Sequence, residues 1–539
     1  MSRSTLSTST RRIAQALVSG CLGLLTLALL IALCGRPATA QVDGLLRNPI
    51  VPGDHPDPTI IRFGATYWTA STSGDWAPVF ALYRSTDLHH WTAEGSIFPH
   101  APAWAEGRFW APEMVVDHGR ILAYYVARER GGPLCIAVAT AVQPEGPYTD
   151  HGPILCQQDG SIDPSCARNK HGEPFLIWKE DGNSQHMPTT IWAQPLTSDL
   201  LHVTGEKTQL LANDPASWEG GVVEAPYIMQ HADRFYLFYA GNACCGVDCN
   251  YAEGVARADH LLGPWTRDPA NPIIRPNDLW RCPGHGTAVE TPAGKDLFIY
   301  HAYPVVGNVY LGRESILDSI TWTADGWPVI NGGRGPAAGT HLAAESMQFS
   351  DAFDGSLLNP EWKWPVGHAP EFRVTGGTLK LEVPPNARQA FIARSPLSAA
   401  YTAVVGVLPG GTASGGIAII GDSRNAVGLS RRADHLEVWR IDKRGRQIVW
   451  SGQVPVDKLL WLRVTTSSGE EAEFSFSTDR KAWSAAEGSL TLAGLLPWDQ
   501  GLRVGLVVDG AKGTRASFFH FSVVAHSTQT TTVSAPPNK

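Results

Sequence analysis

Charged residues are scarce in this sequence, and the basic ones are the scarcer kind. They make up 17% of the 539 residues, and 51 aspartates and glutamates outnumber the 43 lysines and arginines, which leaves a formal net charge of −8. Nucleic acids and anionic membranes are bound through clusters of basic side chains. We therefore expect no nucleic-acid partner, and no membrane contact beyond the N-terminal segment.

Long apolar runs are lacking as well, except for one stretch over residues 16–34. Arg11 and Arg12 precede this stretch, and small residues that suit a cleavage site end at Ala40. This order predicts a secretory signal over residues 1–40 and a secreted or periplasmic mature chain. Because the apolar stretch is long for a signal, an uncleaved membrane anchor is the alternative interpretation.

Paired zinc motifs are absent, although the sequence has nine cysteines. Without a second cysteine pair or a histidine pair at zinc spacing, the group Cys244, Cys245 and Cys249 indicates a loop pinned by disulfides rather than a metal site. Seven cysteines follow the predicted signal, so at least one stays unpaired even in an oxidising compartment. Cys282 is a candidate partner for one of the loop cysteines.

Glycine, proline and tryptophan are abundant, with 54, 39 and 19 residues, a mixture typical of many short strands joined by tight turns. In the first 340 residues, aromatic and β-branched runs recur at intervals of 53 to 61 residues. They centre on Tyr67, Tyr125, Trp178, Tyr239 and Tyr300. Five such units predict a five-bladed β-propeller, since one four-stranded blade cannot bury both of its faces alone. A large β-sandwich with accidental periodicity is the weaker alternative.

An acid or a histidine lies 10 to 15 residues before each aromatic run. These residues are Asp57 in GDHPDP, Glu113 in FWAPEM, Asp163 in SIDPS, Glu224 in VVEAPY and His285 in CPGHGTAV. Equivalent offsets in repeated units indicate equivalent places in the fold, so we expect all five side chains to face the central channel. Proline holds the preceding residue extended and donates no backbone hydrogen bond, which suits the first residue of an innermost strand.

Acids gathered in one water-limited funnel repel one another. Some of their pKa values therefore rise while others stay low, as acid–base catalysis requires. A calcium site and a solvated structural cluster are the competing explanations. The repeat register and the surrounding tryptophans favour catalysis.

These segments, with ITWTADGWPVI, resemble glycoside hydrolase family 43 over about residues 47–335. The resemblance implies an inverting, five-bladed glycosidase that acts on α-L-arabinofuranosides and β-D-xylosides of plant cell walls. It implies that Asp57 is the general base that activates water and that Glu224 is the general acid that protonates the leaving oxygen. Asp163 then orients Glu224 and raises its pKa. Inversion needs an acid and a base roughly 6.5–9.5 Å apart, so that water fits between them.

The resemblance implies further contacts. His285 matches a channel histidine that lies beside a bound calcium or an ordered water, and a buried, hydrogen-bonded histidine is the alternative. Arg313 in LGRES resembles an arginine that contacts the sugar. Trp76, Trp110 and Trp178 are candidate platforms for a sugar ring, with core packing as the alternative for each. Trp110 is the better candidate because it adjoins Glu113, which we also expect near the substrate. No cofactor is required, and calcium in the propeller channel is the one candidate.

From about residue 346 the pattern changes to alternating strands such as TLKLEV, GGIAIIG and LRVGLVV. Their number and spacing predict two stacked antiparallel sheets, similar to the concanavalin-like, jelly-roll-like sandwich of some family members. The expected class is all-β, with a propeller followed by a sandwich. The expected domains are a signal (1–40), a propeller (41–335), a linker and sandwich (336–526) and a disordered tail (527–539).

The leading hypothesis is a secreted enzyme that removes arabinofuranosyl or xylosyl units from polysaccharides or oligosaccharides. We expect exo action, because a capped pocket fits one terminal sugar better than a long groove. The alternative is a non-catalytic or differently specific glycan-binding protein. A protein that has lost catalysis usually lacks one of the three acids, and all three are present here.

Overall fold

The structure, a computed structural model, describes residues 46, 48–306, 308–338, 348–486 and 488–526. The predicted signal, most of the predicted linker and the predicted tail lie outside the described residues. Helical structure in the described part is limited to α2 (Asn308–Leu311) and two 3₁₀ turns, Gly182–Gln185 and Asn331–Gly333. None of the described helices has the length and apolar character needed to cross a bilayer.

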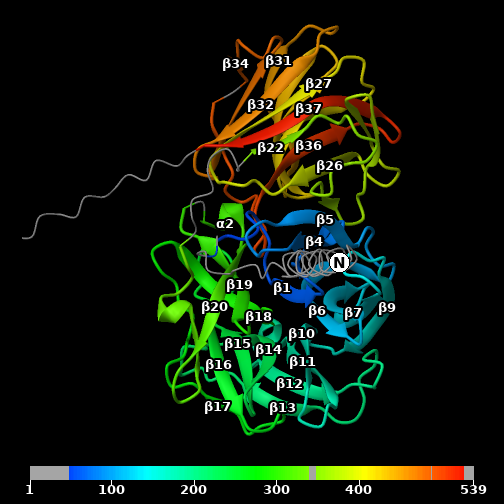
Figure 1. The fold of residues 1–539 in the computed structure, drawn as a ribbon. Coiled ribbons are helices and arrows are strands. Elements are labelled where there is room, and N and C mark those ends of the chain that lie inside the picture. Colours follow the sequence, from blue (N-terminus) through cyan, green and yellow to red (C-terminus); the bar gives the residue numbers. More distant parts are fainter. Residues whose placement is uncertain (1–45, 47, 307, 339–347, 487, 527–539) are drawn as a thin grey trace, which may run out of the picture. The chain divides into compact units, whose positions relative to one another are not determined.

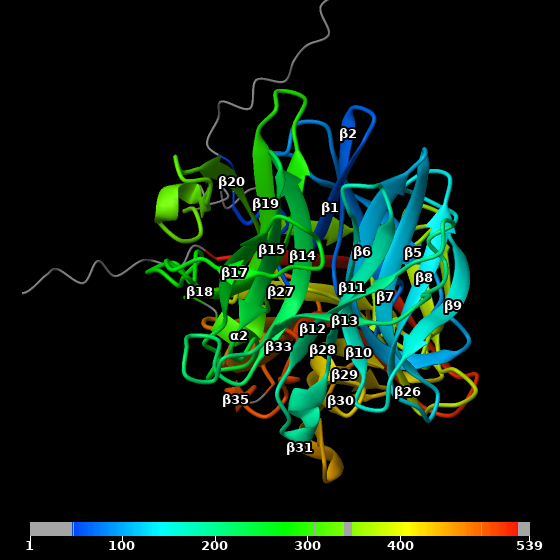
Figure 2. The ribbon, with the colours of Figure 1, turned by 90° about the horizontal axis from the view of Figure 1, so that it is seen from below.

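The first part of the chain forms five four-stranded antiparallel sheets, each built from strands in chain order (Figure 1 and Figure 2). The sheets are called blades 1 to 5 here. Blade 1 contains β1 (Thr59–Phe63), β2 (Thr66–Ala70), β4 (Val79–Ser85) and β5 (Thr92–Phe98), and blade 2 contains β6 (Ala105–Asp117), β7 (Arg120–Glu129), β8 (Leu134–Ala141) and β9 (Thr149–Cys156). Blade 3 contains β10 (Ser161–Arg168), β11 (Pro174–Glu180), β12 (Thr190–Pro195) and β13 (Thr208–Ala212), blade 4 contains β14 (Val223–His231), β15 (Arg234–Gly241), β16 (Ala252–Ala258) and β17 (Thr266–Arg267), and blade 5 contains β18 (Trp280–Glu290), β19 (Asp296–Pro304), β20 (Glu314–Trp322) and β21 (Pro328–Ile330). The first strands β1, β6, β10, β14 and β18 contact one another in a closed ring. The fold is therefore the predicted five-bladed propeller.

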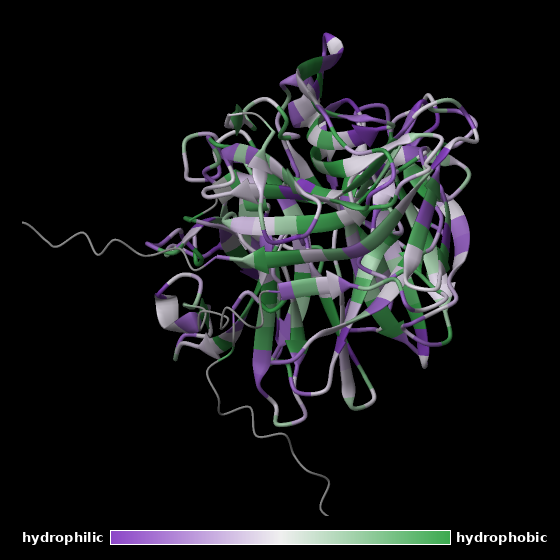
Figure 3. Cartoon of the chain, turned by 90° about the horizontal axis from the view of Figure 1, so that it is seen from above, coloured by the Kyte–Doolittle hydropathy of each residue, from purple (hydrophilic) through white to green (hydrophobic). Residues whose placement is uncertain are grey.

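The recurring aromatic runs are the second strands of the blades. In β7, every residue from Ile121 to Ala127 is buried, because neighbouring blades cover both faces of the strand. A strand buried on both faces reads as a continuous apolar run rather than as an alternation. Figure 3 shows the hydrophobic residues concentrated along the strands and the hydrophilic ones in the outer loops. The period seen in the sequence is thus the period of the blades.

The segments before these runs lie at or in the first strands, but their backbone differs from the prediction. The residue before each proline (or, in blade 5, before a glycine) has a left-handed φ of 44° to 57°; these residues are Asp57, Ala111, Asp163, Ala225 and His285. The prediction of an extended residue before proline is therefore wrong. In blades 2 to 5 the pairing register shifts close to this point, which marks β-bulges, and a proline suits a bulge because it has no N–H to pair.

The bulges also correct the predicted equivalence of the five side chains. Asp57, Asp163 and His285 occupy the same backbone position in their blades. Glu224 precedes that position by one residue, and Glu113 follows it by two. Because side chains alternate across a strand and a bulge re-aims them, these offsets send Glu113 and Glu224 to different places.

Two further sheets form the predicted antiparallel sandwich. One contains β22 (Gln348–Asp351), β24 (Glu371–Thr375), β25 (Thr378–Glu382), β27 (Tyr401–Val407), β32 (Leu460–Thr466), β33 (Glu471–Ser477), β34 (Ser484–Ala485), β35 (Leu490–Thr491) and β37 (Arg515–Ala525); the other contains β26 (Gln389–Arg394), β28 (Ser414–Asp422), β29 (Asn425–Arg432), β30 (His435–Asp442), β31 (Gly445–Gln453) and β36 (Arg503–Asp509). Leu381, Val405 and Leu462 of the first sheet share one buried cluster with Ile417 and Leu506 of the second. The alternation seen in the sequence therefore reflects two inner faces packed together.

The sandwich contacts blade 1 through a short strand pair. β23 (Trp364–Pro365) pairs with β3 (Trp76–Ala77), and the Lys363 ammonium donates to the carbonyl of Pro78 at 2.9 Å. Trp76 is buried among sandwich residues such as Phe391 and Trp439. The prediction that Trp76 is a sugar platform is therefore wrong, and its alternative, core packing, is what the structure has. The same holds for Trp178 of β11, which is fully buried.

Candidate active site

A pocket of about 510 Å³ is lined by the first strands of the propeller and by the loops around them. Six of the nine predicted site residues line it: Asp57, Trp110, Asp163, Glu224, His285 and Arg313. The other three, Trp76, Glu113 and Trp178, do not. A loop of the sandwich contributes Trp498 and Asp499, which sequence reasoning did not place here.

Asp57 lies at the start of blade 1 and is surrounded by donors. The Arg313 guanidinium donates to its Oδ1 at 3.0 Å, and the Thr72 hydroxyl donates to its Oδ2 at 2.7 Å. Nδ1 of His285 lies 3.4 Å and Nδ1 of His301 lies 3.2 Å from the same Oδ1. Burial alone would raise the pKa of Asp57, but Arg313, with His285, holds it well below its usual range. Asp57 is therefore an ionised carboxylate.

His301 was not singled out in the sequence, although it lies in the LFIYHAY run. Its Nδ1 accepts a hydrogen bond from the Asp57 backbone N–H at 3.1 Å, and its ring stacks on Tyr251. Burial lowers the pKa of His301 to about 4, so the ring is neutral at neutral pH. A histidine within an otherwise apolar, buried strand was the available signal.

Glu224 is held between a lysine and a tyrosine. The Lys179 ammonium donates to its Oε2 at 2.8 Å, and the Tyr251 hydroxyl donates to its Oε1 at 2.8 Å. Lys179 is 1% exposed and also contacts Asp181. Burial opposes ionisation of Glu224, but Lys179 overcomes it and lowers the pKa of Glu224.

Asp163 has the opposite electrostatic balance. Its Oδ2 accepts a hydrogen bond from the Ala225 backbone N–H at 2.9 Å, which joins blade 3 to blade 4. Burial raises the pKa of Asp163 to about 6; His285 opposes this rise, and repulsion from Glu224 adds to it. The pKa of Glu224 is thus lowered in this conformation and not raised as predicted, because Lys179, which the prediction overlooked, outweighs the effect of burial.

The aromatic wall of the pocket comes from both domains. Trp110 of β6 and Trp498 of the sandwich meet edge to face, with ring centroids 6.0 Å apart. Arg108 lies over the Trp110 ring at 5.4 Å and near Asp499, with 3.8 Å between Nη1 and the carboxylate. The backbone carbonyl of Asp499 accepts a hydrogen bond from Arg313 at 3.0 Å. The guanidinium that holds Asp57 is thus anchored by the sandwich.

Glu113 faces a second, much smaller cavity, of about 10 Å³, which Asp57, Asp163 and His285 also line. Burial raises the pKa of Glu113 to about 8, so the side chain is neutral at neutral pH. A cavity of this size holds about one water molecule and excludes a sugar. Glu113 is therefore not in the pocket.

Calcium needs several oxygen ligands at short range. Across the described ranges, Glu129, Cys135 and Cys156 are the only acid, histidine or cysteine residues that bring three ligand atoms within 4.8 Å of one another. The two cysteines of that group are bonded to each other. The channel residues, His285 included, form no such group, so their side chains lend no support to the calcium ion considered from the sequence.

Three disulfides use six of the seven described cysteines. They are Cys135–Cys156, Cys244–Cys245 and Cys249–Cys282, and Cys166 is the free thiol. The predictions of a disulfide-pinned loop, of a loop partner for Cys282 and of an unpaired cysteine are confirmed. That two adjacent cysteines pair with each other was not predicted.

Comparison with known proteins identifies the family. The family described as Glycosyl hydrolases family 43 matches residues 46–328, more than half of the chain, and the chain therefore belongs to it. The xylan 1,3-beta-xylosidase of a Vibrio species is 28% identical over 331 residues, which cover 54% of this chain and 58% of that protein. The extracellular exo-alpha-(1->5)-L-arabinofuranosidase ArbA of Cellvibrio japonicus (strain Ueda107) is 26% identical over 304 residues, which cover 51% of this chain and 86% of that protein.

A solved structure extends the likeness to both domains. The xylan beta-1,4-xylosidase from Bacillus halodurans C-125 superposes with a TM-score of 0.72 at 20% identity, over 89% of this chain and 100% of that one. Identity this low shows a shared fold. The sequence alignments, in contrast, span less than two thirds of the length of the Vibrio relative and of an Escherichia coli relative.

Proposed function

We propose that the protein is a secreted, inverting glycosidase that removes terminal α-L-arabinofuranosyl or β-D-xylosyl units from plant cell-wall polysaccharides or oligosaccharides. The observation that carries the proposal is the convergence of Asp57, Asp163 and Glu224, from three different blades, on one pocket of a family 43 chain. The sugar classes come from relatives whose names include xylosidase and arabinofuranosidase. Secretion follows from the N-terminal sequence, and the Cellvibrio relative is named as extracellular.

Asp57 is the proposed general base. An ionised carboxylate can accept a proton from water as the water attacks the anomeric carbon. Arg313 holds the charge on Asp57 through an ion pair of 3.0 Å. Arg313 and Asp57 therefore act as a pair, with the guanidinium fixing the direction of the carboxylate.

Glu224 is the proposed general acid, with Asp163 as the group that controls its charge. The two carboxyls are electrostatically coupled, so protons leave them as a pair rather than from each independently. Below about pH 6 the pair keeps a proton, and the microstate with that proton on Glu224 donates to the leaving oxygen. Lys179 disfavours that microstate in the free protein. Substrate hydroxyls that engage Lys179 would relieve this effect.

Exo action fits the dimensions of the pocket. A volume of about 510 Å³ is in the range of small-ligand sites, and Trp498 of the sandwich closes part of the wall. The reaction uses only protein side chains and water, so no cofactor is proposed. The substrate is a saccharide, and the acidic overall charge offers no basic surface for nucleic acid.

The test is nitrophenol release from α-L-arabinofuranoside, β-D-xyloside and β-D-galactoside substrates. Wild type should turn over at least one of the two pentosides. Glu224→Gln should lose ~10²- to 10⁴-fold in kcat on substrates that need acid assistance while keeping sugar affinity. Glu113→Gln, outside the pocket, is the matched control and should keep wild-type kinetics. Unchanged turnover in Glu224→Gln would remove Glu224 from the mechanism. Sugar binding without turnover of any substrate would favour a glycan-binding protein.

A further inference from the structure

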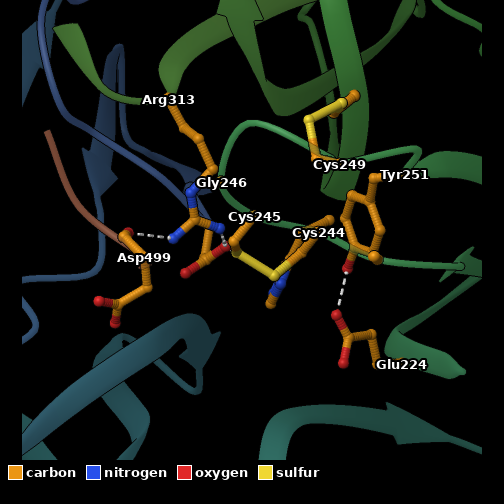
Figure 4. The surroundings of a disulfide bond; sticks show 12 residues. Glu224, Cys244, Cys245, Gly246, Cys249, Tyr251, Arg313 and Asp499 are labelled. Atoms are coloured by element: carbon orange, nitrogen blue, oxygen red, sulfur yellow. Dashed lines mark hydrogen bonds and ion pairs between the residues drawn. A yellow bond between two sulfur atoms is a disulfide. The ribbon is translucent and has the colours of Figure 1, made fainter. Parts of the chain in front are cut away.

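The loop between β15 and β16 places a disulfide bond of two adjacent cysteines in the pocket wall. Cys244 and Cys245 are bonded to each other, and both line the pocket. Figure 4 shows the two sulfur atoms between Arg313 on one side and Tyr251 with Glu224 on the other. The disulfide therefore lines the same pocket as the proposed base and the proposed acid.

Several contacts fix this loop in place. The Ala243 N–H donates to the Asn250 side-chain oxygen at 2.9 Å, and the Asn250 N–H donates back to the Ala243 carbonyl at 3.0 Å. The Cys249–Cys282 disulfide ties the loop to β18, the strand that carries His285. The Gly246 N–H donates to the Tyr303 hydroxyl at 3.3 Å. The wall is thus preorganised rather than a loose loop tip.

The chemistry of the surrounding pocket gives the disulfide a role. The same pocket is lined by charged groups, among them Asp57, Asp163, Lys179, Glu224 and Arg313. They suit the hydroxyl edges of a sugar, but a sugar ring also has an apolar face of C–H groups, which needs an apolar surface. A disulfide is polarizable and has no S–H hydrogen to donate, unlike a pair of thiols. It adds an apolar surface to that of Trp110 and Trp498 in a pocket that also holds the charged acids.

We propose that the Cys244–Cys245 disulfide contacts the apolar face of the terminal pentosyl ring and thereby determines substrate affinity. This inference rests on the proposed glycosidase function. The contact is made to the bound sugar before and during bond cleavage alike. Its loss should therefore raise KM and leave kcat nearly unchanged.

The test compares two disulfide-deletion variants. Cys244→Ala/Cys245→Ala removes the proposed wall but keeps two small apolar side chains. Cys135→Ala/Cys156→Ala, which deletes a disulfide between β8 and β9 whose cysteines do not line the pocket, is the matched control. On the best pentoside substrate we expect KM to rise roughly tenfold in the first variant, with kcat within about threefold of wild type. The control should keep the wild-type KM.

A second measurement is independent of turnover and of small losses in stability. Calorimetry measures the binding of free D-xylose and L-arabinose to two proteins. One is Glu224→Gln, and the other is Glu224→Gln combined with Cys244→Ala/Cys245→Ala. A roughly tenfold weaker binding of the better sugar supports the contact. The proposed contact is overturned if both proteins bind the sugar equally, or if KM is unchanged in Cys244→Ala/Cys245→Ala. It is also overturned if KM rises equally in the control variant, or if Cys244 and Cys245 are free thiols in the mature protein. If wild type cleaves no glycoside, the glycosidase proposal fails, and the sugar-binding comparison still decides the contact.

Discussion

Asp163 provides a quantitative test of the electrostatics, because its burial should destabilise the folded protein at neutral and alkaline pH. The pKa of Asp163 is raised from the usual 3.8 to about 6. The folded state therefore binds the proton more tightly than the unfolded state, and the free energy of unfolding falls as pH rises through this interval. At about 1.4 kcal/mol per pH unit, the ionised carboxylate costs about 3 kcal/mol above about pH 6. Asp163→Asn keeps the shape and the acceptor for the Ala225 N–H but removes the charge. It should be more stable than wild type by about that amount at about pH 8, and about equal to it at about pH 4.

The assay is urea unfolding followed by tryptophan fluorescence at these two pH values. Asp354→Asn is the matched control, since Asp354 is exposed, and it should leave stability within about 0.5 kcal/mol of wild type at both pH values. The reasoning is refuted if Asp163→Asn is less stable than wild type at the alkaline pH, or if its advantage is the same at both. A gain in stability combined with a loss of catalysis would agree with a carboxylate kept for function.

Three further predictions follow from the pocket. Lys179→Met removes the cation that lowers the pKa of Glu224, so the alkaline limb of the pH profile of kcat/KM should move to higher pH. If that limb does not move, Lys179 does not control the protonation of the proposed acid. Trp498→Ala should raise KM about tenfold in steady-state kinetics. The melting temperature, measured by calorimetry, should change little because the Trp498 side chain is 55% exposed. An unchanged KM would exclude Trp498 of the sandwich from substrate binding. Dialysis against EDTA should leave kcat/KM unchanged, because the channel offers no calcium-like ligand set, and an activity restored only by calcium would contradict this.

The sequence predicted the fold well because the propeller repeats the same four-stranded blade five times. Each second strand is covered on both faces, so Tyr125 and Tyr239 and their neighbours stand in long apolar runs that are easy to recognise. Sandwich strands with one buried face, such as β25, show a period of two, whereas β28 is buried on both faces and reads as a continuous apolar run. Both patterns are local in sequence and can be recognised without any knowledge of tertiary contacts.

The candidate site was predicted only in part. Local motifs located Asp57, Asp163 and Glu224, but not the charges that decide their protonation. Lys179 stands in the PFLIWKE strand and meets Glu224 across 45 positions of sequence, a distance that no local pattern reports. A single lysine in a strand that is otherwise buried was the signal available, since such a cation must be paired.

Other features escaped because they arise between elements. Trp498 and Asp499 belong to the sandwich and reach the propeller pocket only after both domains have folded. Glu113 was expected to face the channel like Asp57 and Asp163, and this expectation failed. A β-bulge lies between Trp110 and Glu113, and such a bulge re-aims the side chains that follow it. Trp76 was one of three candidate sugar platforms, and only its packing against Phe391 shows that it is core.

The central claim is that Asp57 and Glu224 cleave a pentoside with a single displacement by water. Proton NMR of the first sugar released tests it most directly, by recording the anomeric configuration before mutarotation. The account predicts the inverted anomer, α-xylose from a β-xyloside, and no such signal from Asp57→Asn. Initial release of the retained anomer would contradict it, since Asp57 would then act as a nucleophile rather than as a base.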